Sequence, residues 1–278
     1  IKQMFGFSGK LLITNIFNHI NNNLFSVILG KFYTEKEVGY YNQANKWCTM
    51  GQSFISGMIN GVAQPVLTKV SDDLERQKRV FRKMLRFTAF VSFPAMLGLS
   101  IISQELITIA ITDKWHSSIS IMQILCISGA FIPIAGLYQQ LIISKGKSHI
   151  YMWNTIVLGI ILLTSVLLAH SHGIYAMLAV YVSINILWIL TWHFFVQQEI
   201  GLKLHHALAD ILPYAVIAAT VMVITYYSTR SIENIYLRLA SKIVLAAALY
   251  VAAMWGSRSV TFKESIQYFI KKKPHEPQ

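Results

Sequence analysis

The chain has 278 residues, of which 54% are hydrophobic and only 13% are charged. Soluble domains carry about 25% charged residues, so this composition excludes an ordinary soluble enzyme and predicts a polytopic membrane protein. The net charge of +12 does not indicate nucleic-acid binding, because the basic residues gather between apolar segments, where they fix topology and meet anionic lipid head groups.

Eight segments are long and apolar enough to cross a bilayer, which takes about 20 residues. We therefore expect an all-α fold of about eight transmembrane helices joined mostly by short loops. The predicted spans are Phe7–Gly30, Gly39–Leu67, Phe87–Ile111, Ile119–Ser144, Ile150–Ala169, Ile174–Val196, Leu208–Tyr227 and Leu237–Trp255.

The first predicted span carries polar residues within about 100° of its circumference. The candidate site residues on this face are Asn15, Asn18, His19 and Asn22. Asn21 and Asn23 widen the same band. Amides are costly to leave unpaired in lipid, so this face must meet protein or water.

The second predicted span repeats the pattern over six turns, with spacings of 4, 3, 4, 7 and 4 residues. Its candidate site residues are Asn42, Lys46, Thr49, Ser53, Asn60 and Gln64. A charge at the centre of a membrane helix costs roughly 2.5–3.5 kcal/mol on insertion scales. The two stripes therefore predict a hydrated cavity that accepts a polar, anionic substrate.

Each of these residues also has a structural interpretation. The amides could form hydrogen bonds between helices, Lys46 could extend to the head groups, and His19 could be a packing group rather than a proton relay. Gly51, Gly57 and Gly61 allow close helix approach in the second span, and the spacing of Gly57 and Gly61 is that of a G-x-x-x-G motif.

The connection from Thr68 to Arg86 is the longest and most basic. Ser71 and Asp72 resemble a helix N-cap, and Arg79, Arg82, Lys83 and Arg86 follow at helical spacing. Either an amphipathic helix on the inner leaflet or a solvated connector fits this pattern.

The later spans are less polar, and the last two lack a polar stripe, so we expect those two to be peripheral and lipid-facing. Pro94 and Pro133 permit kinks in the third and fourth spans. Glu105 is the one acidic residue expected inside a span, and it gives no obvious sodium or proton site. No catalytic motif, cofactor site or metal site is recognised, and we interpret Cys48 and Cys126 as packing residues.

The positive-inside rule orients the spans. Of the 24 lysines and arginines, 17 lie on one side. Two are in the N-terminal segment, seven between the second and third spans, two between the fourth and fifth, one between the sixth and seventh, and five after the last span. This side should be the cytoplasm, with both ends of the chain facing it.

Several motifs resemble those of a transporter family. The run from Val38 to Ala44 (VGYYNQA) is followed by the segment from Gln64 to Asp73 (QPVLTKVSDD). Further matches are Phe93 to Leu99, Asp113 to Trp115, Gln123 to Leu125 and Ser144 to Lys147. In order and spacing these are similar to polysaccharide flippases of the Wzx/WzxC type, in the MOP superfamily of membrane transporters.

The resemblance implies a fourteen-helix transporter, of which this chain holds the second six-helix lobe (residues 1–198), two additional peripheral helices (199–260) and a cytoplasmic basic tail (261–278). The first lobe is then missing, so we expect a fragment. The expected activity is export of undecaprenyl-diphosphate-linked oligosaccharides across the bacterial inner membrane, for lipopolysaccharide or exopolysaccharide synthesis. The expected partners are that lipid-linked oligosaccharide, membrane lipids, the missing lobe, and polysaccharide polymerase and chain-length proteins. The resemblance implies that Lys46, and as a second position Lys10, correspond to the cationic cavity residues of the family.

Two other functions stay open at this point. A small-molecule or drug antiporter of the same superfamily would need an acidic cation site. A membrane-embedded glycosyltransferase would need a charged catalytic cluster and a long outer loop, and every predicted outer loop is short.

Overall fold

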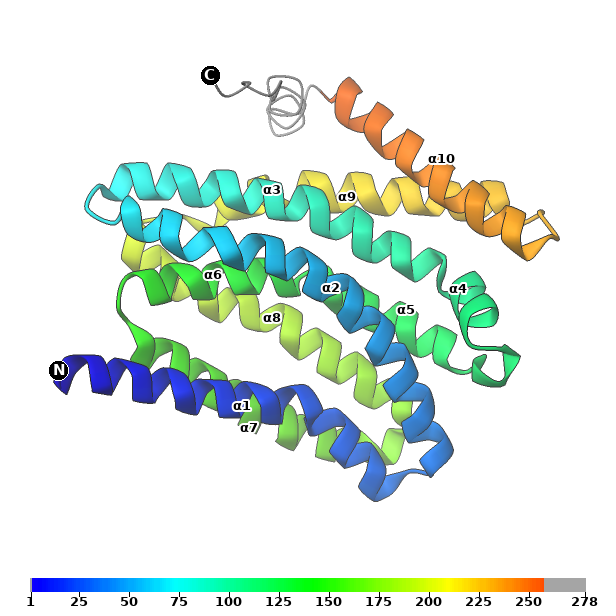
Figure 1. Ribbon diagram of the computed structural model, residues 1–278, viewed down its shortest axis with the longest axis horizontal. Helices are drawn as coiled ribbons and strands as arrows, with labels where there is room; N and C mark the ends of the chain where they lie inside the picture. Colours follow the sequence, from blue (N-terminus) through cyan, green and yellow to red (C-terminus); the bar gives the residue numbers. More distant parts are fainter. Residues whose placement is uncertain (1, 258–278) are drawn as a thin grey trace, which may run out of the picture.

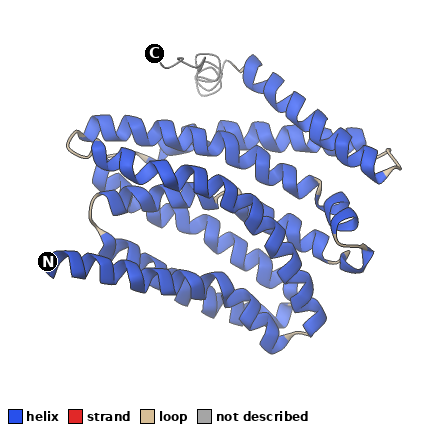
Figure 2. Ribbon diagram, in the orientation of Figure 1, coloured by secondary structure: helices blue, strands red, loops and turns tan. Residues whose placement is uncertain are grey.

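The computed structural model describes residues 2–257, with side chains from residue 9 onward, so the predicted tail at 261–278 lies outside the described residues. The described part is helical and contains no strand (Figure 2). Its helices are α1 (Lys2–Phe32), α2 (Glu35–Lys69), α3 (Leu74–Ile101), α4 (Ser103–Ala110), α5 (Ser118–Gly129), α6 (Ile132–Ser144), α7 (Ser148–Ala169), α8 (Ile174–Ile200), α9 (Leu204–Thr229) and α10 (Ile235–Gly256), with 3₁₀ turns at Asp113–Trp115 and His170–His172.

Eight membrane-length segments are present, as predicted, but two of them are broken. The third consists of α3 and α4, separated at Ile102, and the fourth of α5 and α6, separated at Ala130 and Phe131. The second break comes just before Pro133, which cannot donate a helical hydrogen bond. The buried Ser92 hydroxyl donates to the Ala130 carbonyl at 2.7 Å, so this break leaves that acceptor satisfied. Pro94 lies within α3 without interrupting it.

Six of these segments meet a combined test of length and apolarity for crossing a membrane. They are α3, the α5–α6 segment, α7 with its 3₁₀ turn, α8, α9 and α10. Helices α1 and α2, with 31 and 35 residues, are long enough, but their amide and hydroxyl side chains lower their hydropathy. The two long helices that do not meet the test are thus the two that carry the predicted polar stripes.

The first two helices pack against different partners. α1 lies along α7, whereas α2 lies against α3, α5 and α6. Figure 1 shows the two helices diverging from their shared hairpin. Thr34 caps α2 in a reciprocal capping box with Glu37, which closes the turn between them. Aromatic rings fill the core at this end, with the centroids of Phe25 and Tyr41 4.7 Å apart.

The basic segment before the third span belongs to α3 itself. Asp73, rather than Ser71 or Asp72, is the N-cap, and its carboxylate accepts from the Arg76 amide at 2.9 Å. The helix then runs unbroken to Ile101, so neither a separate surface helix nor an irregular connector forms. This basic segment stays in line with the rest of α3 because Arg82 and Arg86 pair with Asp210 on α9.

Candidate functional site

Helix α1 presents three distinct faces. One face, which includes Thr14, Asn21 and Phe25, is buried. A second face exposes large apolar side chains: Ile13, Ile16, Ile20 and Val27. The third face lies between them and exposes polar side chains: Asn15, His19, Asn22 and Asn23. The exposed Leu12 is the apolar residue at the edge of this face, beside His19 and Asn23 in helical phase. An exposed polar face that is separate from the exposed apolar face indicates two different surroundings.

Helix α2 has the same three faces. Its buried face includes Tyr41, Cys48 and Ile55. Its exposed apolar face consists of Met50, Phe54, Met58 and Val62. Its exposed polar face holds all six residues predicted there, which are Asn42, Lys46, Thr49, Ser53, Asn60 and Gln64.

The two polar faces converge where the helices are closest. The Ser26 hydroxyl of α1 donates to the Asn42 side-chain oxygen of α2 at 2.9 Å. From this contact the helices diverge (Figure 1). We call the exposed polar residues of the two helices the polar hairpin surface: Asn15, His19 and Asn22 on α1, and the six residues of α2 from Asn42 to Gln64.

Of the ten predicted site residues, Asn18 alone is not exposed. It is half-buried, and its amide donates to the Tyr151 hydroxyl of α7 at 2.9 Å. Asn21 is fully buried and donates to the Thr155 carbonyl of α7 at 3.0 Å. These two amides therefore bond helix to helix, and the structural interpretation holds for them.

Lys46 is exposed on the polar hairpin surface, between Asn42 and Thr49. Within the part of the chain that the structure describes, it forms no ion pair with an acidic side chain. Its ammonium is therefore available to an anion from outside the described chain.

Within the described residues, no helix approaches Gly57 or Gly61 closely. A Cβ atom built on either glycine would meet nothing within 4 Å. The close approach predicted at Gly51 is confirmed, since a Cβ there would lie 3.0 Å from the Leu99 side chain. Cys48 and Cys126 are buried free thiols, which agrees with a packing role.

A first buried ion cluster joins α3 to α9. Asp210 is 4% exposed and accepts from Arg82 Nε at 2.6 Å and Nη2 at 3.0 Å. Arg86 Nη1 donates to the same carboxylate at 3.0 Å. This cluster holds α9 along α3 near the start of both helices.

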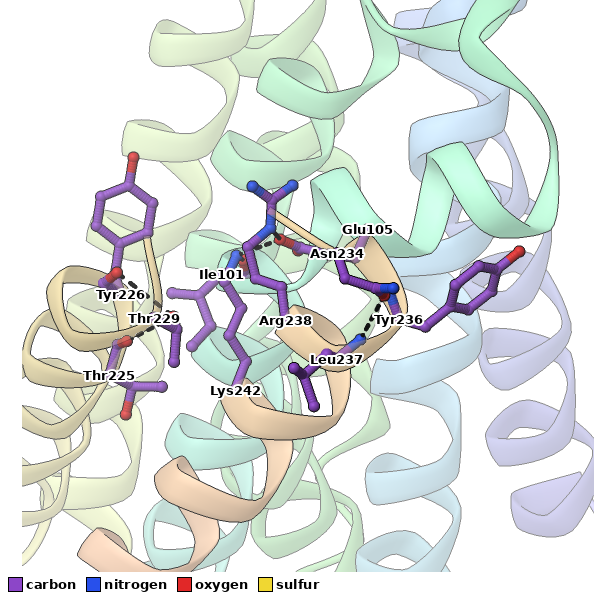
Figure 3. A network of polar contacts seen from close by, with 10 residues as sticks. All are labelled: Ile101, Glu105, Thr225, Tyr226, Thr229, Asn234, Tyr236, Leu237, Arg238 and Lys242. Atoms are coloured by element: carbon purple, nitrogen blue, oxygen red, sulfur yellow. Dashed lines mark hydrogen bonds and ion pairs between the residues drawn. The ribbon is translucent and has the colours of Figure 1, made fainter. Parts of the chain in front are cut away.

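A second buried cluster joins α4 to α10 (Figure 3). Both Arg238 Nε, at 2.6 Å, and Lys242 Nζ, at 2.8 Å, contact Glu105 Oε1. Lys242 also donates to the Ile101 carbonyl at 2.8 Å, an acceptor exposed by the break at Ile102. Glu105 is thus engaged by two cations.

Both clusters were missed by sequence reasoning. The last two spans were expected to lack polar character, yet Asp210 and Lys242 are buried in α9 and α10, and Glu105 is not the only acidic residue within a span. A signal existed, because a lysine four residues after an arginine in an apolar helix requires a partner. What the sequence could not give was the partner's position on α4.

Comparisons with known proteins agree with this architecture. Residues 1–120 match the family described as "Polysaccharide biosynthesis protein". An uncharacterized membrane protein in the cps region of Klebsiella pneumoniae is 33% identical over 150 residues, which are 54% of this chain and 31% of that protein. The lipopolysaccharide biosynthesis protein WzxC of Escherichia coli (strain K12) is 28% identical over 144 residues, which are 52% of this chain and 29% of that protein.

The fold has a counterpart among solved structures. The lipid II flippase MurJ, in an inward closed conformation, superposes with a TM-score of 0.72 over 91% of this chain and 53% of that chain, at 16% identity. The chain thus spans about a third to a half of the length of the proteins it matches. Together these likenesses confirm the resemblance inferred from the sequence motifs.

Proposed function

We propose that this chain, a relative of the polysaccharide flippases of the MOP superfamily, serves in the transport of an undecaprenyl-diphosphate-linked oligosaccharide across the bacterial inner membrane, for lipopolysaccharide or exopolysaccharide synthesis. The observation that carries the proposal is the polar hairpin surface. It extends from Asn42 to Gln64 on α2 and from Asn15 to Asn22 on α1, and it is distinct from the main exposed apolar faces of the two helices.

The chemistry of this surface fits such a substrate. Amide and hydroxyl side chains such as Asn22, Ser53 and Asn60 both donate and accept hydrogen bonds, as sugars require. Lys46 supplies a point charge for a diphosphate. The exposed apolar faces of α1 and α2 keep contact with lipid, where the isoprenoid tail of the substrate would remain.

The arrangement of the helices also fits transport by alternating access. In such a motion α1 would move with α7, and α2 with α3, α5 and α6, because these are the main contacts of each helix. The two polar faces meet at the hydrogen bond between Ser26 and Asn42. Beyond that point α1 packs on α7, whereas α2 packs on α3, α5 and α6. A rocking motion that changes their separation would expose the surface to one side at a time.

The antiporter alternative lacks comparable support. It needs an acidic cation site, and within the described residues Glu105 and Asp210 are each already engaged by two basic side chains. An acidic site in the expected first lobe would favour this alternative.

Lys46 provides the direct test. We expect Lys46→Ala in the intact protein to reduce surface polysaccharide at least tenfold and Lys46→Arg to retain a large part of it, because the requirement is for a cation at this position. Export is measured as surface polysaccharide in cells that depend on the variant for that activity.

A matched control lies on the same helix. Lys36, in the first turn of α2, is also exposed but lies outside the polar hairpin surface, so Lys36→Ala should export normally. Normal export by Lys46→Ala, at equal protein level, would remove Lys46 from the mechanism.

A further inference from the structure

A pocket opens between α3, α9 and α10, away from the polar hairpin surface. Its volume is about 310 Å³, at the lower end of the roughly 300–1,000 Å³ range of small-ligand sites. The lining residues are Arg86, Ala209, Pro213, Tyr214, Ile217, Met254 and Ser257. Arg86 is the one charged residue among the described residues of this lining, and most of the others are apolar. A ligand with a charged group attached to a hydrocarbon chain would fit this combination.

The cationic edge has more positive than negative charge. Arg82 and Arg86 share the single carboxylate of Asp210, so this cluster keeps a net charge of about +1. Among the described residues, Arg86 donates to Asp210 through Nη1, and it lines the pocket. Its remaining guanidinium donors can therefore reach a ligand without breaking the ion pair, and a guanidinium fork matches the oxygens of a phosphate.

A hydrogen-bond acceptor, the Ala209 carbonyl, lies on the α9 side of the same pocket. Pro213 has no N–H, so the carbonyl of Ala209, one turn earlier, lacks its usual helical donor. Ala209 and Pro213 both line the pocket. A ligand that brings a hydroxyl beside its phosphate would satisfy this carbonyl.

The pocket lies near the depth of lipid head groups. It is bounded by Met254 and Ser257 at the end of α10, and Trp255 between them is 71% exposed. Exposed tryptophans mark the membrane–water interface. By the distribution of charge along the chain, this end faces the cytoplasm.

We propose that this pocket binds the head group of an anionic glycerophospholipid. The phosphate contacts Arg86, a head-group hydroxyl donates to the Ala209 carbonyl, and the first part of the acyl chains lies along Pro213 and Ile217. A zwitterionic lipid brings its own cation and gains less from the excess charge of the cluster. The bound lipid would join α3 to both C-terminal helices.

The test is native mass spectrometry of the purified full chain in detergent, titrated with phosphatidylglycerol or phosphatidylcholine of the same acyl chains. We expect phosphatidylglycerol to bind more tightly. Arg86→Gln should weaken its binding about tenfold, because a charge-assisted contact is lost. Arg79→Gln is the matched control, since it removes the same charge from an exposed position on α3 and should leave binding unchanged.

A second pair of variants keeps every charge in place, so it decides the matter even if Arg86→Gln folds poorly. Ala209→Leu fills the pocket and should abolish the preference for phosphatidylglycerol, whereas Ala219→Leu, at an exposed position further along α9, should not. Equal binding of the two lipids, wild-type binding by Ala209→Leu, or an equal loss in Arg79→Gln and Arg86→Gln would each overturn the proposal. These measurements do not involve transport, so their outcome is independent of the proposed function.

Discussion

Neighbouring asparagines on α1 have different environments because of helical phase. Asn21 is buried against α7, whereas Asn22, one residue later, is rotated by about 100° and exposed. Asn18 lies near the border of the two faces and bonds to Tyr151. A polar band about 100° wide therefore includes asparagines that bond to another helix and asparagines that are exposed. The sequence pattern predicts the band, but it does not predict which asparagine belongs to which group.

The fit of Asn21 against α7 depends on a glycine. A Cβ at Gly159 would overlap the Asn21 side-chain oxygen and lie 3.0 Å from its Cγ. We therefore expect Gly159→Ala to displace Asn21 from the Thr155 carbonyl and to lower the free energy of unfolding by about 1–3 kcal/mol. The measurement is thermal unfolding of the purified protein in detergent.

Gly57 is the control for this substitution. It is also a helical glycine, but a Cβ there would meet nothing within 4 Å. Gly57→Ala should leave the unfolding temperature unchanged or raise it slightly, because alanine favours helix by about 1 kcal/mol. If both substitutions lowered the unfolding temperature equally, the close contact between Asn21 and Gly159 would not be the cause of the destabilisation.

At the scale of elements, the break between α3 and α4 determines how α10 attaches. Because the helix is interrupted at Ile102, the Ile101 carbonyl and the Glu105 carboxylate both reach Lys242 (Figure 3). Membrane helices gain little from apolar contact alone, since lipid is equally apolar. A buried ion cluster therefore gives α10 a defined position against the bundle, which its apolar side chains would not specify.

Removing the shared carboxylate should expose this dependence. Glu105→Gln leaves Lys242, which is 3% exposed, beside Arg238 without a counter-charge. Breaking a buried ion pair costs about 3–5 kcal/mol, so we expect a marked fall in the unfolding temperature. Adding Lys242→Met should restore a large part of it, because the unpaired buried charge is then gone.

An exposed glutamate sets the baseline for that experiment. The Glu75 side chain is 74% exposed and lies 3.8 Å from Lys78, a pair expected to contribute little. Glu75→Gln should leave the unfolding temperature within error. If Lys242→Met failed to rescue Glu105→Gln, the cluster would not be the element that fixes α10.

At the scale of the whole molecule, the features that depend on local sequence were predictable. The eight membrane-length segments follow from runs of apolar residues, and the polar faces of α1 and α2 follow from helical spacing. The features that depend on distant contacts were not. Asp210 pairs with Arg82, and Glu105 pairs with Lys242 of α10, across more than 100 positions of sequence. No local pattern encodes these contacts, and none predicts the break at Ile102.

The three-faced character of α1 and α2 makes a prediction about solvent around the whole protein. Ser53 and Phe54 are adjacent on α2 and both exposed, Ser53 on the polar face and Phe54, 75% exposed, on the apolar face. If water meets the polar face and lipid the apolar one, the two positions differ in hydration. Thiols react with maleimide as thiolates, which form in water and not in hydrocarbon.

We expect Ser53→Cys to react with a water-soluble maleimide at least tenfold faster than Phe54→Cys, in lipid nanodiscs and in a background in which Cys48 and Cys126 are replaced by alanine. Both native thiols are buried, so this background removes slow labelling that would obscure the comparison. Glu35→Cys, at the exposed start of α2, gives the rate for full access to water. Equal rates at positions 53 and 54 would mean that one environment surrounds both faces, and a polar face surrounded by lipid could not guide a sugar across the membrane.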